Sequence, residues 1–183
     1  MNSAQMTPLR LRRLIYAALY LAMALVLPFV TGQIPEFGSM LCPMHIPALL
    51  CGFMCGWSWG LAVGFIAPLL RSVLFGMPPM FPGAVAMAFE IAVYGGMAGF
   101  LKRKLPEKKG VTYAVLILSM IAGRIVWGAV QVILAGLSGN AFTWALFLEK
   151  AVADAVPGII LQLVLIPVLV FAMQRAGLAL NRN

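Results

Sequence analysis

The stretch LRRLIYAALYLAMALVLPFV, residues 11–30, decides the class of fold. Arg12 and Arg13 precede an apolar run from Leu14 to Val30 that contains no charged residue. A run of this length can cross the hydrocarbon core of a bilayer as one helix, which needs about 20 predominantly apolar residues. The sequence therefore predicts a transmembrane helix over about 12–30.

The composition extends this prediction to the rest of the chain. Of 183 residues, 63% are hydrophobic and only 10% are charged. Soluble domains are usually about 45–50% apolar and about 25% charged, so a soluble fold of this length could not cover its apolar surface. Membrane spans joined by short loops would use nearly the whole chain. We therefore expect no soluble catalytic domain, such as an ATPase, within it.

Five further apolar segments are separated by glycine, proline and polar residues. Residues 56–60 are expected to turn between the second and third helices. Pro157 and Pro167 are expected to kink or divide the last helix, because proline disrupts the helical hydrogen bonds. The prediction is an all-α membrane protein with a single transmembrane domain over residues 1–183. Its six transmembrane helices are expected at about 12–30, 43–56, 61–75, 84–101, 111–137 and 142–175.

The distribution of cations predicts the orientation of this bundle. With the N-terminus inside, the predicted cytoplasmic segments hold ten of the thirteen Lys and Arg residues, and the three predicted outer loops hold none. Positively charged loops stay in the cytoplasm. Both termini are therefore expected to be cytoplasmic, in a multi-pass protein of a bacterial-type cell membrane. The net charge of +8 then reflects topology and lipid contact, and nucleic-acid binding is not expected.

Six charged residues fall within predicted spans: Arg71, Glu90, Arg124, Glu149, Lys150 and Asp154. A charge inside a bilayer is costly unless it is paired, hydrated or facing a cavity. One interpretation is therefore that these residues form three ion pairs that hold helices together. The other is an outward-facing ligand pocket, because they gather in the predicted outer half and middle of the bundle, whereas its inner half is almost wholly apolar. A plain channel would need polar groups along its full length.

Helical spacing and residue type add further candidates. Shared helix faces are expected for Arg124 with Trp127 and Gln131, for Glu90 with Tyr94, and for Lys150 with Asp154. Trp127 could belong to the core instead, and Lys150 and Asp154 could simply pair. His45 could cap its own helix or contact a ligand. As the single histidine, it excludes a histidine-based metal cluster, and Cys42, Cys51 and Cys55 are expected to be small buried side chains rather than metal ligands.

A resemblance to a known family begins with Ala18 and Ala22 in the first predicted helix. Small residues at i and i+4 flatten a helix face and allow another helix to approach closely. Together with six spans, both termini inside and an outer pocket, this feature resembles the substrate-binding S-component of energy-coupling factor (ECF) vitamin transporters over the full chain. The stretches PMHIP (43–47), GMPP (76–79) and FEIAVYG (89–95) are also similar to members of this family.

The resemblance implies a transporter subunit that is not an enzyme and holds no cofactor. ATP would be used by two ATP-binding partner subunits, joined to this chain through a coupling transmembrane protein that docks on Ala18 and Ala22. The sequence agrees in lacking the Gly-x-x-x-x-Gly-Lys-[Ser/Thr] motif for nucleotide phosphates. The implied substrate contacts are Glu90, Tyr94, Arg124, Trp127, Gln131, Asn140, Glu149, Lys150 and Asp154, with His45 and Arg71 as further candidates. Pantothenate is the first choice of substrate, followed by a pyridoxine-like or hydroxymethylpyrimidine-like compound.

Three other classes of function compete with this interpretation. An intramembrane enzyme would need a nucleophile with its base, or metal ligands, at workable spacing, and the sequence contains neither Gly-x-Ser-x-Gly nor His-Glu-x-x-His. A non-transport six-span scaffold would use the intramembrane charges only as ion pairs. A stand-alone transporter would work without ATP-binding partners. Both of the last two alternatives stay open from the sequence.

Overall fold

Helices form the regular structure of the described residues. The structure is a computed structural model, and it describes residues 3–30, 42–106, 109–137 and 156–178. The predicted all-α class is confirmed for this part of the chain. Its elements are α1 (Ser3–Val30), α3 (His45–Cys55), α4 (Trp57–Phe75), the short π-helical turn η1 (Met80–Ala84), α5 (Val85–Lys104), α6 (Lys109–Leu137) and α8 (Val156–Arg175).

Among the described residues, five helical stretches are long and apolar enough to cross a membrane. They are Pro8–Val30, Trp57–Phe75, Met80–Lys104, Gly110–Leu137 and Val156–Arg175. The apolar helix α3 has 11 residues and so is only about 16 Å long, roughly half the thickness of the hydrocarbon core. The chain is thus a multi-pass membrane protein, and a sixth complete span stays a prediction.

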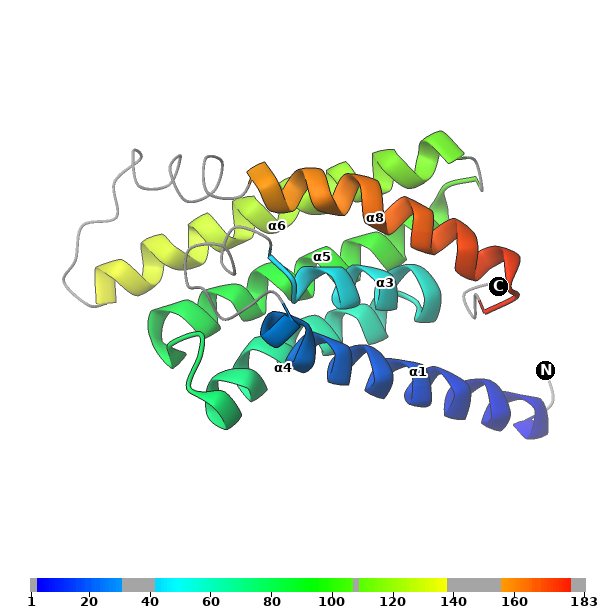
Figure 1. The fold of residues 1–183 in the computed structure, drawn as a ribbon, viewed down its shortest axis with the longest axis horizontal. Coiled ribbons are helices and arrows are strands. Elements are labelled where there is room, and N and C mark those ends of the chain that lie inside the picture. Colours follow the sequence, from blue (N-terminus) through cyan, green and yellow to red (C-terminus); the bar gives the residue numbers. More distant parts are fainter. Residues whose placement is uncertain (1–2, 31–41, 107–108, 138–155, 179–183) are drawn as a thin grey trace.

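Successive helices run in opposite directions along the bundle (Figure 1). The start of α1, the end of α5, the start of α6 and the end of α8 all lie at one end, which we call the terminal end. The starts of α3 and α5 lie toward the opposite end. This arrangement agrees with both termini lying on one side of the membrane. Which side that is stays a prediction.

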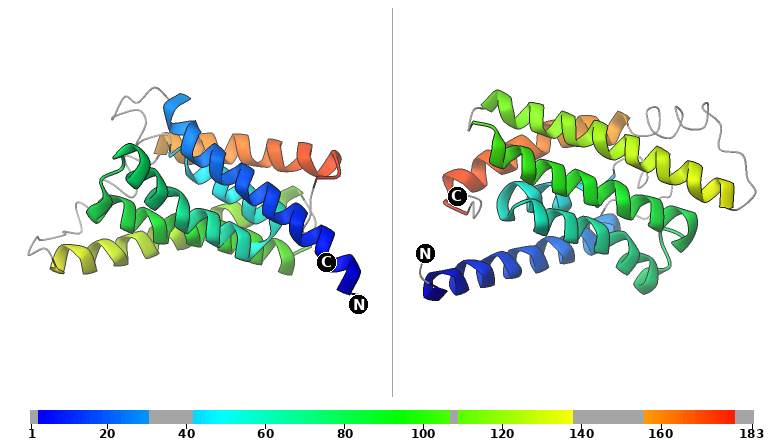
Figure 2. Two further views of the ribbon diagram at one scale, coloured as in Figure 1. Left: turned by 90° about the horizontal axis from the view of Figure 1, so that it is seen from below. Right: turned by 180° about the vertical axis from the view of Figure 1, so that it is seen from behind.

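The short helix α3 forms the centre of the bundle. It packs against α1, α4, α5 and α8, and all of its residues are buried. Helix α1 lies at one edge of the bundle and α6 at the other in two views (Figures 1 and 2). Both carry exposed apolar side chains, such as Leu14 and Ile125, on their outer surfaces. A lipid environment would cover these surfaces without loss of free energy.

Glycines allow α3, α4 and α5 to approach one another closely. A Cβ atom at Gly60 of α4 would lie 2.5 Å from the carbonyl oxygen of Gly95 in α5, and one at Gly52 of α3 would overlap with the same oxygen. No side chain fits at these positions unless the backbones separate. Packing of this kind through small residues is typical of membrane helices, where van der Waals contact replaces the hydrophobic effect.

The helix boundaries differ from the predicted ranges at two places. Helix α1 begins at Ser3 rather than near residue 12, so its first turns precede the apolar run. Residues 57–60, expected to be part of a turn, already belong to α4. Gly56 alone separates α3 from α4, because its φ of 104° lies in a region that residues other than glycine rarely adopt. Residues 142–155 of the last predicted helix lie outside the described residues.

Candidate functional site

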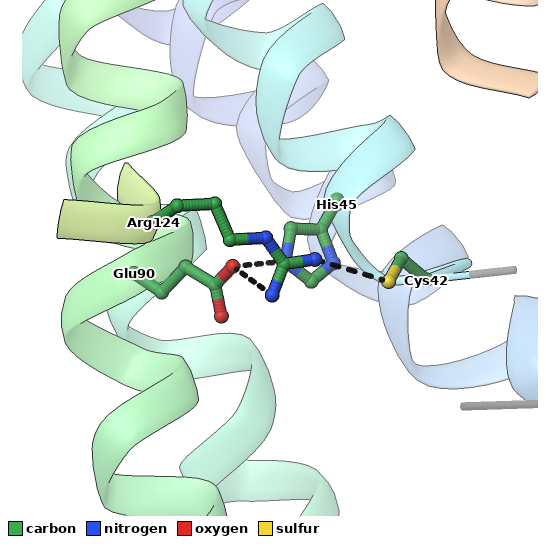
Figure 3. A network of polar contacts seen from close by, with 4 residues as sticks. All are labelled: Cys42, His45, Glu90 and Arg124. Carbon is green, nitrogen blue, oxygen red and sulfur yellow. Dashed lines mark hydrogen bonds and ion pairs between the residues drawn. The ribbon is translucent and has the colours of Figure 1, made fainter. Parts of the chain in front are cut away.

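Four polar residues from separate parts of the chain meet inside the bundle, and we call them the polar cluster: Cys42, His45, Glu90 and Arg124 (Figure 3). His45 is the first residue of α3, Glu90 lies in the second turn of α5, and Arg124 lies midway along α6. The side chains of His45 and Glu90 are each only 2% exposed, and that of Arg124 is 16% exposed. The cluster is therefore a buried polar site in a chain of predominantly apolar helices.

Glu90 is the centre of the cluster's charge interactions. Its Oε1 lies 3.0 Å from Nη1 of Arg124 and 3.5 Å from Nε2 of His45. A buried carboxylate requires such a partner, because desolvation of an unpaired charge costs several kcal/mol. Of the two interpretations of the intramembrane charges, an ion pair between helices is thus what the structure contains for Glu90 and Arg124.

The second terminal nitrogen of Arg124 points the other way, toward Cys42 (Figure 3). Nη2 donates a weak hydrogen bond to Sγ of Cys42 at 3.8 Å. Cys42 lies just before α3. The guanidinium group is therefore fixed between α5 and the chain that enters α3.

Several buried polar atoms of the cluster have unused hydrogen-bonding capacity. Within the described residues, the two ring nitrogens of His45 and the Nε of Arg124 form no hydrogen bonds. The contact of Glu90 Oε1 with Arg124 also lacks hydrogen-bond geometry. Buried polar groups are normally satisfied, and each exception needs an explanation. An ion pair that served only to hold helices together would not account for the unsatisfied imidazole.

Tyr94 closes one side of the cluster, one helical turn after Glu90 on α5. Its ring meets the His45 ring edge to face, with 4.9 Å between centroids. Gly123 of α6 makes room for this ring, because a Cβ there would overlap with it. Glu90 and Tyr94 thus reach the same site from one helix face, as their spacing predicts.

Two other predicted substrate contacts, Trp127 and Arg71, pack against apolar side chains. Trp127 is 7% exposed and packs with Ala86 and Leu134 in a small hydrophobic cluster. Arg71 on α4 donates a hydrogen bond to the carbonyl oxygen of Leu25, and its guanidinium lies over the Phe29 ring, 4.5 Å from the centroid. These contacts join α1 to α4 at the end of the bundle opposite the terminal end. A substrate role for either residue stays a prediction.

The remaining predicted contacts add little to the described site. Gln131 is half-buried on α6, two turns beyond Arg124. Asn140, Glu149, Lys150 and Asp154 lie outside the described residues. The alternative role of His45 as a cap of its own helix is not observed, since α3 begins without a side-chain cap. The sequence predicts His45 only as a further candidate for substrate contact. In the structure it is the member of the polar cluster that best distinguishes a binding site from a simple ion pair.

Sequence reasoning did not include Gln162 among the candidates. It lies on α8, is only 2% exposed, and its amide oxygen has no hydrogen-bond partner among the described residues. The available signal was an amide within the apolar run IILQLVLI, residues 159–166. The prediction of helix faces started from charged residues, so it included Gln131 beside Arg124 but not Gln162, although burial of an uncharged amide is also costly.

The two alanines proposed for docking lie on the outside of α1. Ala18 and Ala22 are exposed, whereas their neighbours Ala17 and Ala24 are 4% and 0% exposed. The Ala18/Ala22 face is therefore not used in the internal packing of the described bundle. It is free to contact another helix, although no partner is identified by this exposure alone.

Comparison with known proteins gives one family. The model of the family described as "ECF transporter, substrate-specific component" matches residues 12–180. The searches of curated proteins and of solved structures gave no match. The family match covers all the helices described above from Arg12, in the third turn of α1, onward.

Proposed function

The chain belongs to the family of ECF transporter substrate-specific components, and from this premise we propose that it binds a vitamin or vitamin precursor at the polar cluster for uptake into the cell. As a transporter component it is not an enzyme. The observation that carries the proposal is the unsatisfied His45 ring beside the Glu90–Arg124 pair. These groups have hydrogen-bonding capacity that a polar ligand would use.

The position of the cluster supports an entry route from outside the cell. His45 begins α3, and Glu90 lies only about 8 Å along α5 from Val85, at the usual helical rise. Both residues are therefore nearer to the end of the bundle opposite the termini. If the termini are cytoplasmic, as the cation distribution predicts, this end faces outward.

The chemistry of the cluster favours a substrate with a carboxylate. The Nε of Arg124 is a buried donor that forms no hydrogen bond among the described residues, and the His45 ring forms none either, although its Nε2 lies 3.5 Å from Oε1 of Glu90. Hydrogen bonds from a charged donor such as the guanidinium to a carboxylate are strong in a dry site. Pantothenate is therefore the first candidate. A pyridoxine-like or hydroxymethylpyrimidine-like compound is the second candidate, because Glu90 could accept hydrogen bonds from its hydroxyl or amino groups.

Energy for uptake would come from partner subunits. We propose that two ATP-binding subunits and a coupling transmembrane protein assemble with this chain, and that the Ala18/Ala22 face is its docking surface. The exposure of both alanines supports this assignment. Co-purification with ATP-binding subunits separates it from a stand-alone transporter, which would transport in liposomes without them.

Equilibrium binding to the purified protein tests the substrate class. Pantothenate should bind with a dissociation constant at or below about 1 μM. Its alcohol analogue, panthenol, has the same skeleton without the carboxylate and is the matched control. Loss of one or more charge-assisted hydrogen bonds predicts roughly 10- to 100-fold weaker binding of panthenol. Equal affinities for pantothenate and panthenol would contradict recognition of the carboxylate. Saturable binding of pyridoxine, with none of pantothenate, would favour the second candidate substrate.

A further inference from the structure

A cavity lies at the terminal end of the bundle, away from the polar cluster. Its volume is about 600 Å³, and it is lined by Trp57, Phe100, Arg103 and Lys104. Trp57 is the first residue of α4, and the other three lie in the last turns of α5. The walls thus consist of two aromatic rings and two cations.

The local helix packing creates this cavity. Gly99 of α5 abuts the backbone of Trp57 so closely that a Cβ at Gly99 would overlap with it. The close approach fixes the Trp57 and Phe100 side chains on the surface, where each is 46% exposed. The Lys104 Nζ lies 5.9 Å from the Phe100 ring centroid, within the range of a cation–π interaction. Close backbone packing between α4 and α5 therefore positions the two aromatic rings, and Arg103 and Lys104 complete the walls of the cavity.

An apolar stripe continues from the cavity toward the middle of the bundle. Trp57, Leu61 and Phe65 share one face of α4 at i, i+4 and i+8, and all three are exposed. Phe89 of α5 extends this surface, with its ring 5.5 Å from that of Phe65. A free anion would make no contact with this apolar stripe, whereas an acyl chain would pack against it.

We propose that this cavity binds the head group of an anionic phospholipid, with an acyl chain lying along Trp57, Leu61 and Phe65. Arg103 and Lys104 bind the phosphate, and neither forms an ion pair with an acidic residue among those described. Aromatic residues at the level of the head groups are typical of membrane interfaces, and basic pockets between membrane helices bind acidic lipids. The site is independent of the transported substrate.

Quenching of tryptophan fluorescence by lipids brominated on their acyl chains tests this site. The difference between the wild type and Trp57→Phe isolates the signal of Trp57 from that of the other tryptophans. In the reconstituted protein, brominated phosphatidylglycerol should occupy the site more tightly than brominated phosphatidylcholine. Two interfacial cations predict a preference of roughly 30-fold at low salt.

A charge-matched pair of variants gives the control. Arg103→Gln/Lys104→Gln should abolish the preference for phosphatidylglycerol, whereas Arg10→Gln/Arg175→Gln removes two cations from the same end of the bundle and should leave it unchanged. An equal loss in both double variants would show general surface attraction and overturn the proposal. Recovery of Trp57 fluorescence on addition of inorganic phosphate would overturn it as well, because the cavity would then take a free anion rather than a lipid.

Discussion

The side chains of Glu90 and Arg124 show what a buried charge requires inside a membrane protein. Each is tolerated because the other lies 3.0 Å away. Removal of one partner from such a pair typically costs about 3–5 kcal/mol, because the remaining charge is left buried without compensation. Removal of both charges can cost much less. The pair is therefore open to a test that separates its structural role from its role in binding.

Glu90→Gln and Arg124→Gln should each lower the thermal unfolding midpoint in detergent. The double variant Glu90→Gln/Arg124→Gln should be more stable than the sum of the two losses predicts, because no unpaired charge remains. If the pair also binds substrate, this double variant should fold and yet lose affinity. Additive losses of stability would contradict the ion pair, and unchanged substrate affinity would reduce it to a contact between helices.

The sequence predicted the charged members of the cluster but not their arrangement. Glu90 and Arg124 could be selected from the sequence, because a charge within an apolar span is costly and is usually paired or functional. Their pairing with each other, and the approach of His45 and Cys42, depend on how α3, α5 and α6 pack. Helical spacing could place Tyr94 beside Glu90, since both belong to one helix. It could not place Cys42 beside Arg124, because no periodicity relates residues so far apart in the chain.

At the scale of the helices, glycine contacts between α3, α4 and α5 determine how closely the bundle packs. Gly60→Ala should destabilise the protein by about 1–3 kcal/mol, because its Cβ would lie 2.5 Å from a backbone oxygen that cannot move alone. The matched control is Gly136→Ala in α6, where an added Cβ meets nothing within 4 Å. This control should leave the unfolding midpoint unchanged or raised. Equal midpoints for the two variants would show that the helices are not in close contact.

The alanine face of α1 gives a second prediction at this scale. Ala18→Trp should abolish transport by the assembled complex while substrate binding and the unfolding midpoint stay intact, because Ala18 is exposed. Ala24→Trp on the opposite side of the same helix should instead unfold the protein, since Ala24 is 0% exposed. Transport assays in liposomes, together with binding measurements, distinguish the two. Full transport by Ala18→Trp would contradict the docking assignment.

The apolar runs of the sequence predict where the helices lie more accurately than they predict where the helices begin and end. The core of each described helix lies in an apolar segment of the sequence. The boundary between α3 and α4 was expected over residues 56–60 because two glycines frame it. Only Gly56 adopts a positive φ, whereas Gly60 serves the contact with Gly95. Composition cannot separate a glycine that ends a helix from one that lets two helices touch.

At the scale of the whole molecule, the two ends of the bundle differ in chemistry. The polar cluster lies toward the end where α3 and α5 start, and the basic cavity lies at the terminal end. The sequence predicted this polarity from the distribution of its cations. The lipid-binding cavity itself required the structure, because its walls come from two helices and the fit between them.

The central claim is that the polar cluster holds a small-molecule substrate, and His45→Phe tests it most directly. This change keeps an aromatic ring against Tyr94 and removes only the two nitrogens that lack hydrogen bonds among the described residues. Ser119→Ala is the control, because it removes a buried hydroxyl that bonds only within α6. Native mass spectrometry of protein purified with vitamins in the growth medium should find one bound small molecule on the wild type and on Ser119→Ala, and a roughly tenfold lower occupancy on His45→Phe. Equal occupancy on His45→Phe and the wild type would contradict the account.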